Sequence, residues 1–217
     1  MTKVLTIERE YGSGAAAIAQ KVAARLGWKL WDQLLTDEIT RRMECDRRHV
    51  EQHEERRDPL HYRFFKAFLR GSFEGNLNTP RMRIADAEGI RQMTEKLVRA
   101  AAAEGDAVIV GRGSAYYLRD RLDVFNVFIY APFEEKVRRL QLQEKSQAEA
   151  IQLAESVDRD RAAFIKEYFA VEWPARHFFH LMINSTIGEE TAAQLIANSL
   201  VLIQESNTAA PNDLPKR

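Results

Sequence analysis

The sequence lacks three features, and each absence excludes a class of protein. It contains a single cysteine, Cys45, so no disulfide framework can form within the chain. It has no run of about 18 apolar residues and no apolar secretory segment near its start, so we expect neither a membrane span nor export. Lysine plus arginine total 32, as do aspartate plus glutamate, and this balance argues against a general nucleic-acid coat. We therefore expect a cytoplasmic protein without a membrane or nucleic-acid partner.

Short apolar strands alternate with helical patterns along the chain. Strands are predicted at 3–7, 29–31, 107–110, 124–130 and 180–183, and helices at 15–26, 34–44, 82–104, 133–143, 147–169 and 191–203. This alternation is typical of an α/β protein whose parallel sheet is covered by helices on both faces. A chain of 217 residues is long enough for one sizeable core and too short for two large domains.

Glycines cluster where two of these strands end. Gly12 and Gly14 follow the first strand, and Gly111 and Gly113 follow the strand at 107–110. Ligands of parallel sheets bind beyond the carboxyl ends of the strands, and a glycine turn before a helix points backbone N–H groups at a phosphate. The pattern predicts a phosphate-binding loop made of Gly12, Ser13, Gly14, Ala15 and Ala16.

This loop departs from the usual phosphate-loop motif, G-x-x-x-x-G-K-[ST]. Aligned on Gly14, the first glycine is replaced by Arg9, the lysine by Ala15 and the hydroxyl residue by Ala16. Alanine keeps its backbone N–H, so anion binding survives, but the charge that meets the transferred phosphoryl group is missing. Arg9 is the nearest candidate for that charge. On the motif alone, a purely structural turn is the alternative interpretation.

Five segments in the same order resemble the cytidylate kinase-like family. They are LTIEREYGSGAAAIAQKVAARLGWKLWDQLL, VIVGRGSAYYL, VFIYAPFEEKVRRL, DRDRAAFIKEYF and HLMINST, which together reach from about residue 4 to residue 186. The resemblance implies a three-layer P-loop nucleoside monophosphate kinase-like fold, with a five-stranded parallel sheet in the order 2-3-1-4-5. It also implies ATP-dependent phosphorylation of a nucleoside monophosphate, CMP or dCMP, with ATP and Mg²⁺ as cofactors.

The resemblance also divides the chain. Residues 1–205 form one kinase-like domain, with a core at 1–42 and 104–205 and an acceptor-binding helical insertion at 43–103. A lid is expected at about 138–169, and residues 206–217 are expected to form a flexible tail. The oligomeric state is left open.

Site residues follow from the same resemblance, position by position. The acceptor-binding residues implied are Asp32, Arg112, Asp158 and Arg161, and the catalytic cations are Arg9, Arg138 and Arg139. Alternatively, each lid arginine lies on the exposed face of a solvated helix, and Asp32 caps the next helix. Gly113 stands where cytidylate kinases carry an aspartate that contacts the substrate, which weakens the prediction of cytosine recognition. No protein metal site is predicted.

Two other functions remain open. The three consecutive alanines that begin at Ala15 favour a nucleotide-binding protein with weak or no catalysis. The unusual segment at 43–103 favours a kinase that acts on another small molecule.

Overall fold

The computed structural model describes residues 2–32, 34–35, 87–143 and 145–209. Its centre is a sheet of five parallel strands in the order β2-β3-β1-β4-β5. The strands are β1 (Val4–Arg9), β2 (Lys29–Trp31), β3 (Ala107–Val110), β4 (Val124–Tyr130) and β5 (Leu181–Asn184). The predicted fold class and strand order are confirmed, and β1 lies in the middle of the sheet.

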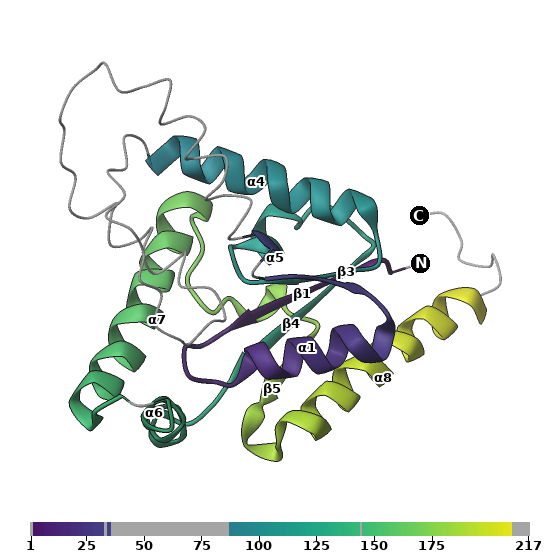
Figure 1. The fold of residues 1–217 in the computed structure, drawn as a ribbon. Coiled ribbons are helices and arrows are strands. Elements are labelled where there is room, and N and C mark those ends of the chain that lie inside the picture. Colours follow the sequence, from purple (N-terminus) through teal and green to yellow (C-terminus); the bar gives the residue numbers. More distant parts are fainter. Residues whose placement is uncertain (1, 33, 36–86, 144, 210–217) are drawn as a thin grey trace.

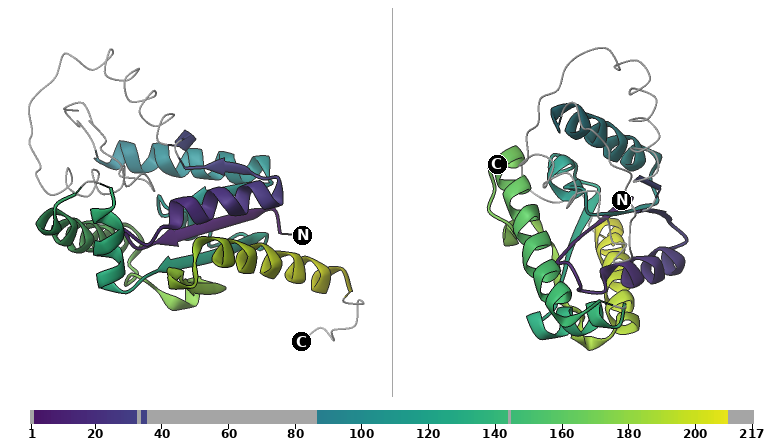
Figure 2. Two further views of the ribbon diagram at one scale, coloured as in Figure 1. Left: turned by 60° about the horizontal axis from the view of Figure 1, so that its bottom comes forward. Right: turned by 60° about the vertical axis from the view of Figure 1, so that its left-hand side comes forward.

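Helices cover both faces of the sheet (Figures 1 and 2). α1 (Ala15–Leu26) and α8 (Glu189–Ala209) lie on one face, while α4 (Ala87–Glu104) and the short α5 (Ser114–Tyr117) lie on the other. The alternation of side chains along β1 sets this division, because Leu5 and Ile7 pack with α1 and α8, whereas Val4 packs with α4. The residues of β1 are therefore buried throughout.

Two helices after β4 flank the carboxyl ends of the strands (Figure 1). α6 (Phe133–Gln141) and α7 (Gln147–Phe169) pack together through an apolar cluster that also takes in Tyr11. Ser146 and Glu149 form a reciprocal capping box that fixes the start of α7. The predicted lid segment is therefore a helical hairpin packed against the β1–α1 loop.

Some boundaries differ from the sequence prediction. β1 extends two residues further, to Arg9, and α5 was not predicted. α8 continues to Ala209, past the predicted start of the tail. α4 packs on the sheet beside β3, while residues 36–86, which make up most of the predicted insertion and the helix at 34–44, lie outside the described residues. No helix in the described ranges is long and apolar enough to cross a bilayer.

Candidate functional site

The loop between β1 and α1 has the shape of an anion cradle. Gly12 (φ 79°) and Gly14 (φ 75°) adopt the left-handed backbone conformation that glycine takes without steric cost. The fully buried Ser13 hydroxyl donates a 2.7 Å hydrogen bond to the Glu10 carbonyl, which holds the turn closed. α1 begins directly after Gly14 without a side-chain cap, so its first N–H groups are left for a ligand or solvent.

Lys136 of α6 lies against this loop. A Cβ atom on Gly12 would be 3.1 Å from the Lys136 Cβ atom, so the helix touches the loop directly. The Lys136 ammonium lies 3.1 Å from a carboxylate oxygen of Glu10 and 3.1 Å from one of Asp158. Burial works to lower the pKa of Lys136, but the two carboxylates outweigh burial and raise that pKa above its ordinary value. Lys136 therefore stays charged and links the loop to both α6 and α7.

Arg139 ties the same loop to the turn after β5. Its guanidinium donates to the Ser13 carbonyl at 2.5 Å, to the Ser185 hydroxyl at 2.8 Å and to the Ser185 carbonyl at 3.2 Å. Its Nε donates to Glu135 at 2.8 Å. Arg139 is thus brought to the predicted phosphate loop, where its side chain cross-links three segments.

We expect Arg139→Ala to lower the free energy of unfolding by about 1.5–3 kcal/mol, the range for hydrogen bonds to a charged group. Chemical denaturation measures this. The neighbouring Arg138 is the matched control, because its side chain is 60% exposed and contacts only Glu135 among the described residues. Equal stability of Arg139→Ala and Arg138→Ala would contradict the cross-linking role.

Asp158 and Arg161 of α7 form hydrogen bonds with the backbone of the loop. Asp158 accepts a 2.8 Å hydrogen bond from the Tyr11 N–H, and Arg161 donates a 2.9 Å hydrogen bond to the Arg9 carbonyl. Arg161 also lies 3.3 Å from the Asp158 carboxylate. The structure brings both residues to the place where α7 packs against the loop.

Three arginines converge where β1 and β3 end. Arg9 and Arg112 are only 5% and 3% exposed, and Arg161 is mostly buried as well. Burial above all, together with the charges of Arg9 and Arg161, lowers the pKa of Arg112 to about 9, against the opposing charges of Asp32 and Glu8. An anion bound here would reduce this repulsion.

Gly111 makes room for this arrangement. Its backbone is left-handed (φ 65°), and a Cβ atom there would be 1.5 Å from the Arg9 guanidinium. Glycine at this position leaves the space that the Arg9 guanidinium occupies, and a larger residue would require Arg9 to move.

Glu8 is the buried carboxylate of this cluster. Burial raises its pKa, while the charges of Arg9 and Arg161 and the backbone N–H groups of Ala115 and Ser114 lower it. The net direction is upward, so desolvation outweighs the arginines. Burial, and after it the charge of Glu8, raises the pKa of the Tyr116 hydroxyl. That hydroxyl therefore stays neutral.

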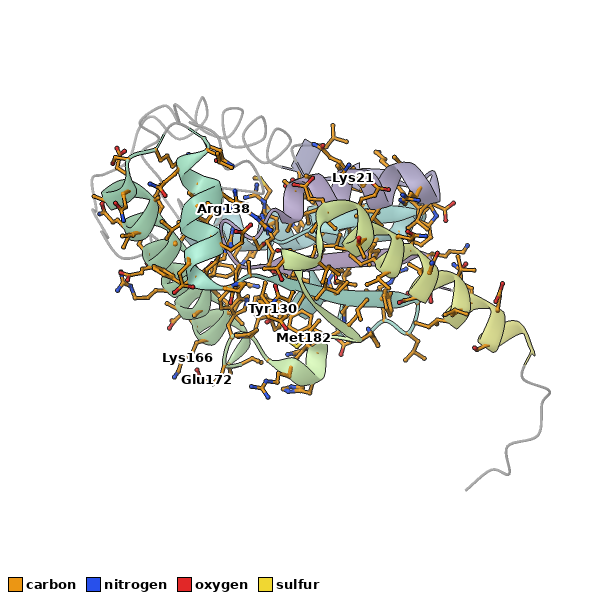
Figure 3. The ribbon with its side chains drawn as sticks, turned by 90° about the horizontal axis from the view of Figure 1, so that it is seen from below. Lys21, Tyr130, Arg138, Lys166, Glu172 and Met182 are labelled. Atoms are coloured by element: carbon orange, nitrogen blue, oxygen red, sulfur yellow. The ribbon has the colours of Figure 1, made fainter. Side chains whose placement is uncertain are left out.

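The remaining predicted residues lie around this centre. Asp32, at the end of β2, is half-buried and attracts Arg112 electrostatically. Ala15 is buried in the core cluster between the sheet, α1 and α8. Arg138, labelled in Figure 3, lies on the exposed side of α6, where it pairs with Glu135.

The ring of Phe169 lies where a side chain at position 113 would point. A Cβ atom there would be 3.2 Å from the Phe169 ring, and the backbone is again left-handed (φ 68°). Phe169 also packs against Tyr116 and Tyr117. An aspartate at this position would therefore contact the Phe169 ring. Glycine avoids this contact and lets the ring pack against the turn.

The described residues do not fit a protein-bound Mg²⁺. Ala16 stands where a loop hydroxyl would coordinate the ion, and the Ser13 hydroxyl is buried against the Glu10 carbonyl. The described part of the chain contains no group of three or more His, Cys, Asp or Glu side chains that could hold a metal. The loop glycines, by contrast, leave the open backbone cradle that nucleotide phosphates require.

The comparison that decides the family covers most of the chain. A family model described as the cytidylate kinase-like family matches residues 4–187. The chain belongs to this family. Among curated protein sequences, none matches significantly.

Solved structures share the fold at low sequence identity. An uncharacterized protein from Eubacterium ventriosum is 18% identical with a TM-score of 0.64, covering 92% of this chain and 99% of its own. Shikimate kinase from Bacteroides thetaiotaomicron is 14% identical with a TM-score of 0.52, covering 93% and 99%. Shikimate kinase from Acinetobacter baumannii, solved with shikimate, is 15% identical with a TM-score of 0.50, covering 97% of both chains. The family member described here thus has the fold of P-loop kinases.

The sequence analysis missed two residues of the site. The sequence does hint at Glu8, because a carboxylate near the end of a predicted buried strand needs a partner in the fold. The hint at Lys136 is weaker: it is the first lysine of a helix that begins shortly after a strand end. Neither residue matched a motif, and only the packing of α6 and α7 reveals their partners.

Proposed function

We propose that this cytidylate kinase-like protein binds the phosphate group of a nucleoside monophosphate, CMP or dCMP, among Arg9, Arg112 and Arg161. The observation that carries the proposal is the buried cluster of three arginines, whose mutual repulsion an anion relieves. The cluster lies beside the phosphate loop, as phosphoryl transfer between two bound phosphates requires.

ATP would place its phosphates on the backbone N–H groups of the loop from Gly12 to Ala16. In transfer, an acceptor phosphate oxygen forms a bond to the γ-phosphorus, the bond from that phosphorus to the β–γ bridging oxygen breaks, and ADP leaves. The protein's part is to hold the two anions in line and to supply positive charge. Because Ala15 and Ala16 supply neither the usual lysine nor a metal-binding hydroxyl, we expect slow or absent turnover.

A coupled ATP-consumption assay with a panel of nucleoside monophosphates, run beside a binding titration, tests this. Turnover with CMP or dCMP supports the kinase. Binding without turnover supports the alternative of a nucleotide-binding protein, which the alanines favour. Turnover only with another acceptor supports a different small-molecule kinase, which the aromatic cover over Gly113 favours. Absence of monophosphate binding would contradict the proposal.

Arg112→Ala should weaken CMP binding by about 1.5–3 kcal/mol, the range for a hydrogen bond to a charged group, or about 10- to 150-fold. The melting temperature should change little, because removing one of three crowded cations relieves repulsion. Calorimetric titration and thermal melts measure both quantities. Arg119→Ala, at an exposed position seven residues along the chain, is the control and should bind CMP normally. Unchanged affinity together with loss of folding would make Arg112 purely structural.

A further inference from the structure

We propose that Arg139 takes the place of the missing loop lysine and that Ser185, in the turn after β5, is the residue that positions it. The donor phosphates then meet a cation that α6 supplies to the loop. The inference rests on the proposed function, because it takes the loop from Gly12 to Ala16 as the site of the ATP phosphates. It deepens that proposal by naming the cation.

The loop has no cation of its own. Ala15, at the position of the usual lysine, is 2% exposed and packs in the core cluster with the sheet and α8. Arg9, the candidate from the sequence, lies against Gly111 in the β3–α5 turn instead. The first turn of α1 contains no acidic residue, and Gly14 provides no side-chain cap. The first N–H groups of α1 are thus left for an anion, while a charged partner for that anion has to come from another element.

Arg139 lies where α1 begins. A Cβ atom on Gly14 would be 3.0 Å from the Nη1 atom of Arg139. Because Gly14 is the N-cap residue, the guanidinium stands beside the positive end of the helix dipole. These two positive groups repel each other, and both attract an anion that binds between them. The Glu189 carboxylate, 3.9 Å from the same Cβ position, is exposed, so solvent screens its charge.

Arg139 also keeps a hydrogen-bond donor for a ligand. A guanidinium has five N–H groups. Nη1 donates to the Ser13 carbonyl and to the Ser185 hydroxyl, Nε donates to Glu135, and Nη2 donates to the Ser185 carbonyl. The second N–H of Nη2 has no partner within the described ranges, and the side chain is 18% exposed. This N–H can donate to a phosphate oxygen without breaking the contacts that hold the guanidinium.

Ser185 and Glu135 set the place and the charge of Arg139. Ser185 is fully buried and accepts from Arg139 with both its hydroxyl, at 2.8 Å, and its carbonyl, at 3.2 Å. Ser185 therefore acts on a ligand only through Arg139. Glu135 pairs with Arg138 as well as with Arg139, so one carboxylate is shared by two guanidinium groups and the set keeps a net positive charge.

Titration calorimetry of the full-length protein with ATP and with inorganic tripolyphosphate, both without divalent cations, tests the role of Arg139. In Arg139→Gln the amide still donates hydrogen bonds but the charge is gone. We expect both ligands to bind about 10- to 150-fold more weakly, the range for one hydrogen bond to a charged group. Arg139→Lys, which keeps the charge, should recover part of the affinity. Arg138→Gln is the matched control and should bind both ligands as the wild type does, because Arg138 is exposed and pairs with the same Glu135.

A double-mutant cycle tests the role of Ser185. Ser185→Ala should weaken tripolyphosphate binding several-fold in the wild-type protein and not at all in Arg139→Gln. Equal losses in both backgrounds would contradict a role through Arg139. The affinity for CMP should match that of the wild type in all of these variants, which also shows that they fold.

The outcomes separate this inference from the proposed function. Wild-type affinity of Arg139→Gln for tripolyphosphate would overturn the role of Arg139 and leave the loop as the phosphate site. A loss with ATP but not with tripolyphosphate would place Arg139 at the nucleoside part of ATP and also overturn that role. If the wild-type protein binds CMP but neither ATP nor tripolyphosphate, the inference and the donor site both fail and the acceptor site stands. If Arg139→Gln does not fold, unchanged tripolyphosphate affinity of Ser185→Ala would overturn the inference.

Discussion

Gly111→Ala is expected to destabilise the protein by about 2–5 kcal/mol and to abolish tight binding of the monophosphate. The new Cβ atom would lie 1.5 Å from the Arg9 guanidinium, so Arg9 must leave its position in the cluster. Holding alanine in the left-handed backbone region costs about 1–2 kcal/mol, and overpacking adds about 1–3 kcal/mol. Denaturant unfolding and a CMP titration measure the two effects.

Gly27→Ala is the matched control. Gly27 has almost the same backbone conformation (φ 66°), but a Cβ atom there meets nothing within 4 Å. This variant should show only the backbone cost of about 1–2 kcal/mol and normal CMP binding. If Gly111→Ala and Gly27→Ala lose the same stability and bind CMP equally well, then Arg9 does not occupy the place that the structure assigns to it.

Lys136→Met is expected to lower the free energy of unfolding by about 3 kcal/mol, toward the lower end of the range for breaking a buried ion pair. The loss has a clear physical cause, because the ammonium neutralises both Glu10 and Asp158 in a mostly buried position. Removing it takes the shared cation from both carboxylates and leaves Arg161 as the cation beside Asp158 among the described residues. The affinity for ATP should also fall, because the loop loses its link to α6 and α7.

An exposed lysine provides the comparison. Lys166 of α7 pairs with Glu172 on the surface, as Figure 3 shows, and Lys166→Met should leave stability unchanged within error. Adding Asp158→Asn to Lys136→Met should recover part of the loss, since an amide oxygen can still accept from the Tyr11 N–H. A stable Lys136→Met single variant would show that the network of α6, α7 and the loop is not held by this charge.

The structure also changes the interpretation of the alanine-rich loop. The cations beside it come from other elements: Lys136 and Arg139 from α6 and Arg161 from α7. All three are engaged with loop residues or with the side chains next to them. α6 and α7 therefore hold the loop in shape in this protein, and the turnover assay tests whether the site also supports phosphoryl transfer.

The sequence by itself determined the architecture. Apolar strands alternating with amphipathic helices specify a parallel sheet, because only burial on both faces satisfies strands such as Ala107–Val110. The glycines at 12, 14, 111 and 113 marked two turns beyond strand ends where the backbone is left-handed, because glycine adopts that conformation without steric cost. The order of the strands came from the family resemblance and was confirmed.

Only the tertiary structure decided which charges meet. Glu8 and Arg161 are more than 150 positions apart along the chain, and no spacing rule relates a strand residue to a helix that packs across its end. The adjacent residues Arg138 and Arg139 look alike in sequence, yet the turn of α6 points one to solvent and the other to Ser13 and Ser185. Long-range electrostatics depends on distances that folding creates, and for this reason the sequence predicted a phosphate site but not the carboxylate buried beside it.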